Sequence, residues 1–348
     1  MGARSSNTHR GGSRNNSQNR LLNGHLSSFY NSNLNGGNIG PNPAPSTVEL
    51  SGGTIITTPT HKYHSFTSSG NFQNSGGGVQ ENVSIILVGG GGGGGTDSYG
   101  DNRGAGGGGG GGVNKWESQT IAGNTTYTVT VGSGGAGAPP TNSTPTGIQG
   151  GYNGESSTFG SPTNPIEITV GGGGGGAGHS PTAHQTSLPF TTTGSGGGAS
   201  NDGTGGEGGT YGNDGGNYSP GGTSGGPGCY YCGSGGGGAV TAGEGASAPG
   251  AGGGGNGRNY SVPNGGVVPT SLGESGIFGG GGGGKGHTGG AGGPGGGGAG
   301  AGTGGASGAA PPGTGTPGEA NTGSGGGASR KEIGGAGGSG TVIVYYPI

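Results

Sequence analysis

The chain has 348 residues, of which 112 are glycine and 21 are proline, and only 23% are hydrophobic and 7% charged. Average globular chains hold about 7% glycine and roughly 45–50% apolar residues, so this composition excludes an ordinary side-chain core along the whole length. The formal net charge of −3 gives no general attraction to nucleic acid or to anionic membranes. Any ordered part must be stabilised by backbone hydrogen bonds and close backbone packing.

Residues 1–45 are rich in Ser, Asn, Gly and Arg, and no acidic residue precedes Glu49. We expect a flexible arm that anchors the chain to a partner, and a solvated tail is the alternative. No apolar run is long enough to span a membrane, so membrane insertion is not expected. The first twenty residues are polar, which argues against a secretion signal and favours assembly inside a cell followed by release.

Short runs of β-branched and aromatic residues predict a β-rich domain over residues 46–170. Several of these runs alternate with the period of two that is typical of strands. They lie at 54–58, 61–67, 83–88, 125–131 and 166–170. A last run at 341–346 predicts that residues 336–348 form a closing strand that returns to the early ones. The expected fold is mainly β, a small sandwich or frame with little or no α-helix.

Uninterrupted glycine runs predict packed polyglycine II helices, above all through residues 171–335. This left-handed helix has three residues per turn and no internal hydrogen bonds, so its backbone groups can bond to neighbours on all sides. Pure glycine runs are expected in the interior, and a mixed run such as 289–308 is expected outside. Collagen is excluded by the irregular spacing, and disorder is the alternative. The expected core positions are Gly92, Gly109, Gly173 and Gly282.

Several motifs occur in a fixed order: 52–55, 64–72, 83–95, 127–132, 157–160 and 338–344. In this order they resemble the glycine-rich domain found in many phage and marine viral structural proteins, over roughly residues 52–348. In composition the chain also resembles phage tail-fibre adhesins that have a sandwich of polyglycine helices. The resemblance implies a virion protein whose end loops contact a host receptor, and it carries over no receptor site.

The sequence offers no catalytic, metal-binding or cofactor-binding pattern, and we expect no enzyme. Gly-x-Gly-x-x-Gly and Gly-x-Ser-x-Gly strings arise by chance at this glycine content, and no strand-to-helix context accompanies them. Cys229 and Cys232 form a lone C-x-x-C, which supplies two metal ligands where about four are needed. A local disulfide or two unpaired thiols are therefore expected.

Aromatic residues in the polar loops are the best candidates for contact with a partner, because Tyr gives a large contact area at low entropic cost. The alternative is that they fill the edges of the glycine layers. The candidates are Tyr211, Tyr218, Tyr230, Tyr231 and Tyr260. We expect a tail-fibre or appendage adhesin that binds a host glycan or outer-membrane protein, joins other virion proteins through its arm and forms oligomers, with a trimer as one option. The alternatives are a capsid decoration, a self-assembling filament or an unstructured matrix protein.

Overall fold

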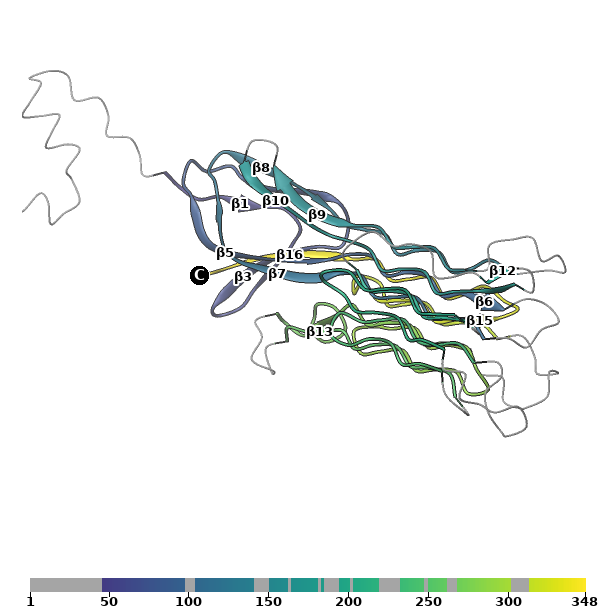
Figure 1. Ribbon diagram of the computed structural model, residues 1–348. Coiled ribbons are helices and arrows are strands. Elements are labelled where there is room, and N and C mark those ends of the chain that lie inside the picture. Colours follow the sequence, from purple (N-terminus) through teal and green to yellow (C-terminus); the bar gives the residue numbers. More distant parts are fainter. Residues whose placement is uncertain are drawn as a thin grey trace, which may run out of the picture. The chain divides into compact units, whose positions relative to one another are not determined.

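The computed structural model describes eleven stretches of the chain and places the residues from Val48 to Ile348 in one compact unit (Figure 1). Those stretches are 46–97, 104–140, 150–161, 164–180, 183–184, 194–200, 203–218, 232–246, 250–261, 268–301 and 313–348. They contain strands and no α-helix, which confirms the mainly β fold. None of their elements is a helix long and apolar enough to cross a membrane. The proposed arm at 1–45 lies outside the described residues.

Sixteen strands occur in the described residues. They are β1 (Leu50–Ser51), β2 (Thr54–Thr57), β3 (His61–Phe66), β4 (Gly70–Asn74), β5 (Gln80–Val88), β6 (Thr96–Asp97), β7 (Val113–Ile121), β8 (Thr125–Thr130), β9 (Ser157–Ser161), β10 (Asn164–Val170), β11 (His179–Ser180), β12 (Ala183–His184), β13 (Arg258–Asn259), β14 (Ile277–Phe278), β15 (Ser329–Arg330) and β16 (Thr341–Pro347).

Two antiparallel five-stranded sheets form a β-sandwich. One has the order β2-β3-β16-β5-β7 and the other β1-β4-β8-β9-β10. Their facing side chains form one buried core, in which the Tyr127 and Phe159 rings stack with centroids 5.1 Å apart. β16 lies between β3 and β5, so the last strand of the chain completes the centre of a sheet that the first strands begin.

Six strands of the sandwich continue directly into glycine segments, and the segments keep the neighbour order of the strands. In one sheet, β5 runs on into residues 89–95, while β7 and β16 follow residues 106–112 and 334–340. Segment 89–95 hydrogen-bonds to both of the other segments, in the same way that β5 pairs with both β7 and β16. Sheets that face each other across side chains lie about 10 Å apart. Glycine removes those side chains, so the segments can bond between layers as well as within them.

Segment 89–95 is buried throughout, and its hydrogen bonds repeat every three residues. Its N–H groups donate, over 2.8 to 3.0 Å, to three different segments: Gly89, Gly92 and Gly95 to Gly112, Gly109 and Gly106; Gly90 and Gly93 to Glu155 and Tyr152; Gly91 and Gly94 to Gly338 and Gly335. Its carbonyls accept from three more, around Gly173, Gly135 and Gly326. Six neighbouring segments therefore satisfy the backbone groups that have no partner within this one.

Outer segments expose one residue in three. In 203–210 the exposed residues are Thr204, Glu207 and Thr210, and in 288–294 they are Thr288, Ala291 and Pro294. Side chains close the edges where a neighbouring backbone is missing. Asp214 and Asn217, three residues apart, accept from the N–H groups of Gly208 and Gly205 at 2.6 and 2.8 Å.

An unbroken glycine run does not by itself place a segment in the interior. Run 252–255 lies only partly in the interior: Gly252 and Gly255 are buried, Gly253 and Gly254 are partly exposed, and the Gly253 N–H donates at 3.1 Å to the carboxylate of Glu244. Segment 323–328 is wholly buried although it includes Ser324 and Ala328. The hydroxyl of Ser324 lies 2.8 Å from that of Thr322, so the buried polar group has a partner. The expected rule is thus wrong for these two segments.

His64 makes the sandwich sensitive to acid. Its side chain is fully buried, its Nδ1–H donates to the Gly52 carbonyl at 2.7 Å, and the Tyr346 hydroxyl lies 3.3 Å from Nε2. Burial lowers the pKa of the imidazole below its usual 6.5. The unfolded chain therefore binds the proton more tightly, and the free energy of unfolding falls as pH drops below about 6.5. Thermal melting across this range should show the slope in the wild type and in a His61→Gln control, and a flatter curve in His64→Gln.

Candidate functional site

The glycine segments end together at a place that we call the distal end, on the opposite side of the bundle from the sandwich (Figure 1). Backbone bonds join its parts: Gly233 donates to Lys285 at 2.7 Å, Lys285 to Ala105 at 2.9 Å, and Arg330 to Gly313 at 2.7 Å. Several stretches outside the described residues are flanked by residues of this end, among them 98–103, 219–231 and 302–312. Residues that flank the longest internal stretches outside the described residues, 219–231 and 302–312, therefore lie at this end.

Buried charges hold the distal end together. Asp97, Lys285 and Arg330 each follow an interior glycine segment, and each is at most 1% exposed. The Lys285 Nζ lies 3.2 Å from Asp97 Oδ2, and the Lys331 N–H donates to Asp97 Oδ1 at 2.7 Å. Desolvation raises the pKa of the Asp97 carboxyl and lowers that of the Lys285 ammonium. Each of these shifts disfavours the charged form of its group, and the pairing of the two groups opposes both shifts.

The three candidate tyrosines in the described residues do not form one surface. Tyr211 is half-buried beside the sandwich, with its ring edge-on to Trp116 at 5.8 Å. Tyr260 packs on the outer face of the β2-β3-β16-β5-β7 sheet, where the Lys115 Nζ lies 5.9 Å from its ring centroid. Tyr218 lies at the distal end against Cys232 and Ala246. Tyr230 and Tyr231 lie outside the described residues. Among the described three, only Tyr218 lies at the distal end.

Cys232 is buried at the distal end and its sulfur is in a disulfide, while Cys229 lies outside the described residues. No group of three or more His, Cys, Asp or Glu side chains that could hold a metal occurs in the described part of the chain. The four expected core glycines are all buried. A Cβ at Gly92, Gly109, Gly173 or Gly282 would lie 2.1 or 2.2 Å from a backbone oxygen of another segment.

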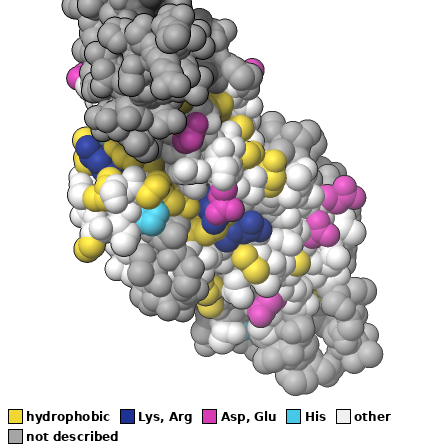
Figure 2. All heavy atoms as spheres, turned by 90° about the vertical axis from the view of Figure 1, so that its left-hand side faces the viewer, with side chains coloured by type: hydrophobic (Ala, Val, Ile, Leu, Met, Phe, Trp, Pro, Cys, Tyr) yellow, Lys and Arg dark blue, Asp and Glu magenta, His cyan; other side chains and the backbone are white. Residues whose placement is uncertain are grey.

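The surface at the sandwich end is mixed in character. Figure 2 views the molecule from this side and shows apolar, basic and acidic side chains interspersed, with a histidine among them. The exposed apolar residues include Ile55, Val79 and Ile348 at 48%, 53% and 65%. No patch of a single charge dominates the described part of this face.

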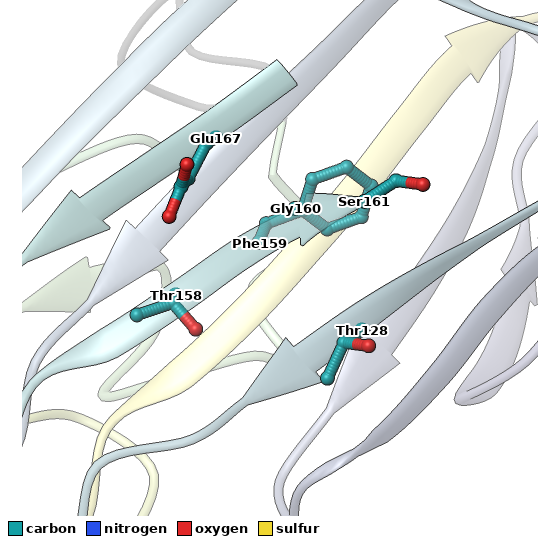
Figure 3. A pocket seen from close by; sticks show the side chains of 6 residues that line it. All are labelled: Thr128, Thr158, Phe159, Gly160, Ser161 and Glu167. Carbon is teal, nitrogen blue, oxygen red and sulfur yellow. The ribbon is translucent and has the colours of Figure 1, made fainter. Parts of the chain in front are cut away.

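A hollow with a mixed polar and apolar lining lies on the outer face of the β1-β4-β8-β9-β10 sheet, over β8, β9 and β10 (Figure 3). Its volume is about 410 Å³, and its lining residues are Thr128, Thr158, Phe159, Gly160, Ser161 and Glu167. The sequence contained part of the signal for it, because the alternation in 125–131 places the threonines on one face of a strand. The partner strands, and with them the hollow, could not be predicted from that alternation.

The fold and these sites define a glycine-rich β-sandwich protein, in which the sandwich continues into a bundle of backbone-bonded glycine segments. The chain belongs to the glycine-rich domain family, whose model matches residues 67–347. None of the curated proteins matches the chain.

Proposed function

We propose that this protein is a non-enzymatic component of a virus particle, an appendage or tail-fibre adhesin of a bacteriophage whose distal end contacts the host surface. The observation that carries the proposal is that residues flanking the longest internal stretches outside the described residues lie together at one end of a bundle whose glycines and charges are buried. Binding sites are commonly built from loops that a rigid scaffold positions. The receptor would be a surface glycan or an outer-membrane protein.

In this proposal the glycine segments are polyglycine II helices packed as a sandwich. The three-residue period of the hydrogen bonds around segment 89–95, and the exposure of every third residue in outer segments, support that conformation. A bundle of this kind gains stiffness without a side-chain core. Such a protein can stand away from a particle and hold loops at its tip.

The remaining parts of the proposal concern assembly. Residues 1–45 attach the chain to other virion proteins, and several copies, in a trimer for example, raise the avidity for the host without new contacts. The particle assembles in the host cytoplasm and then acts outside the cell. The family match extends over residues 67–347 and leaves the arm to be explained separately.

Site-directed blocking tests the proposal. A cysteine introduced at exposed Thr288 of the distal end and coupled to a maleimide polymer should abolish attachment of source particles to their host. The same coupling at Val79, 53% exposed at the sandwich end, should leave attachment intact. Immunogold electron microscopy with an antibody to residues 171–335 locates the protein on the particle. Label over the capsid or along a filament, with attachment unaffected by either coupling, would favour a decoration or filament protein instead.

A further inference from the structure

The hollow on β8, β9 and β10 is centred on a missing side chain. Gly160 pairs with Thr128 on one side and with Glu167 on the other, so the three residues form one row across the sheet. Directly opposed residues of antiparallel strands lie about 4.5–5.5 Å apart, so Thr128 and Glu167 flank an empty position roughly 10 Å wide. Thr158, two residues before Gly160 on the same strand, borders the position on a third side (Figure 3).

Packing does not require glycine at this position. A Cβ on Gly160 would meet its nearest atom, the Ile166 carbonyl oxygen, at 3.3 Å, whereas the glycines of the bundle would meet backbone oxygens near 2 Å. Glycine weakens a strand interior, and its presence often marks a close approach by a ligand. The register also shifts between Asn164 and Glu167 of β10, and such irregularities re-aim side chains beside binding sites.

Three of the polar side chains around the hollow have no partner within the described residues. The hydroxyls of Thr128 and Thr158 and the carboxylate of Glu167 make no hydrogen bond or ion pair there. Thr126, the next outward threonine on β8, instead accepts from the Gln73 amide at 3.0 Å. The volume of about 410 Å³ lies within the usual range for small-ligand sites, about 300–1,000 Å³.

We propose that this hollow binds a saccharide, whose adjacent hydroxyls donate to the Glu167 carboxylate and exchange hydrogen bonds with Thr128 and Thr158. Phosphorylated or carboxylated ligands fit poorly, because the lining holds one carboxylate and no basic side chain. A calcium ion takes six to eight oxygen ligands, which a single carboxylate and two hydroxyls do not supply. The site is separate from the distal end, so it adds a second sugar contact on the sandwich to the proposed function and does not depend on it.

Titration of the full ¹⁵N-labelled chain with glucose, galactose, mannose and N-acetylglucosamine tests the site by NMR. At least one sugar should shift the amides of Thr128, Thr158, Gly160 and Glu167 together, with a dissociation constant in the millimolar range. Gly160→Val should weaken binding at least tenfold by filling the hollow, and it should keep the fold because β-branched residues suit strands. Thr126→Val, on the same strand but outside the lining, should bind as the wild type does.

Glu167→Gln keeps the size of the side chain and removes the charge, so it should weaken binding severalfold without affecting the melting temperature. If Gly160→Val proves unstable, the Glu167→Gln variant alone tests whether the hollow binds the sugar. The proposal is overturned if no sugar of the panel shifts these amides when the sugar concentration is about ten times the expected millimolar dissociation constant. It is also overturned if the shifts lie elsewhere, or if folded Gly160→Val or Glu167→Gln binds as tightly as the wild type.

Discussion

Gly92→Ala is expected to be among the most destabilising single methyl additions in this protein. The added Cβ would lie 2.1 Å from the Gly174 carbonyl oxygen and 2.5 Å from its carbon, both backbone atoms of another buried segment. The segments must separate, and separation breaks hydrogen bonds such as that from the Gly92 N–H to the Gly109 carbonyl at 2.8 Å. Overpacking of a tight core costs about 1–3 kcal/mol, occasionally more, and we expect about 3 kcal/mol here.

Gly250→Ala is the matched control. Among the described residues, the only atom within 4 Å of a Cβ at that position is the Thr288 hydroxyl oxygen, at 3.5 Å, which is an ordinary contact. Alanine reduces the entropy of the unfolded chain, so this variant should be unchanged or up to about 1 kcal/mol more stable. Thermal melting by circular dichroism should therefore separate the two variants by roughly 10 °C. Equal melting of Gly92→Ala and Gly250→Ala would show that the bundle is not close-packed around segment 89–95.

The strands could be predicted from the sequence because their signal lies in side chains. Alternation of β-branched and aromatic residues marks the sequence now seen as β3, β5, β8, β10 and β16. Short strands such as β6, β11 and β15 have two residues each and no alternating pattern to find. The central place of β16 in its sheet follows from long-range pairing, to which no local signal points.

The neighbours of each glycine segment could not be predicted, because a glycine run carries no side chain that selects a partner. The information lies elsewhere, in the strands that continue into the runs and in the charged residues that follow them. The burial of a segment is likewise set by what surrounds it. A buried segment accommodates Ser324 where a local hydroxyl partner exists, and run 252–255 is partly exposed where the Glu244 carboxylate accepts from it.

The candidate site was even harder to predict from the sequence than the neighbours of the glycine segments. Tyr211 and Tyr260 look alike in sequence, as aromatic residues in polar surroundings, yet both pack against the clusters of the sandwich. Whether a loop tyrosine faces solvent or a neighbouring sheet depends on the route of the loop. Gly160 could not be identified as a site residue from the sequence, because nothing distinguishes it from the other glycines among the 112 until its cross-strand partners are known.

The second large effect is expected at the buried pair of Asp97 and Lys285. Asp97→Asn keeps an acceptor for the Lys331 N–H and removes only the charge, so it leaves the Lys285 ammonium and the nearby Arg330 without that carboxylate. Removing one partner of a buried ion pair costs about 3–5 kcal/mol. The melting temperature of Asp97→Asn should therefore drop by roughly 5–8 °C.

The direction of the pH dependence identifies the cause. Burial already lowers the pKa of Lys285, and loss of its partner lowers it further below the unfolded value of 10.5. The unfolded chain then binds more protons, so the free energy of unfolding of Asp97→Asn should rise as pH increases from 7 towards 10. Lys285→Met should behave in the opposite sense and gain stability towards acid pH, because burial raises the pKa of Asp97.

The double variant Asp97→Asn/Lys285→Met completes the test. It removes both members of the pair and keeps their volume, and replacement of a whole buried pair is often neutral. It should therefore be more stable than either single variant, with a coupling free energy of about 0.5–3 kcal/mol. Additive losses would mean that the two side chains act independently, and the register of the three interior segments would then have to come from the sandwich alone. Recovery in the double variant would instead mean that the pair selects the register. Each charge destabilises the protein when it is buried without its partner, so only the register that brings the two charges together is stable.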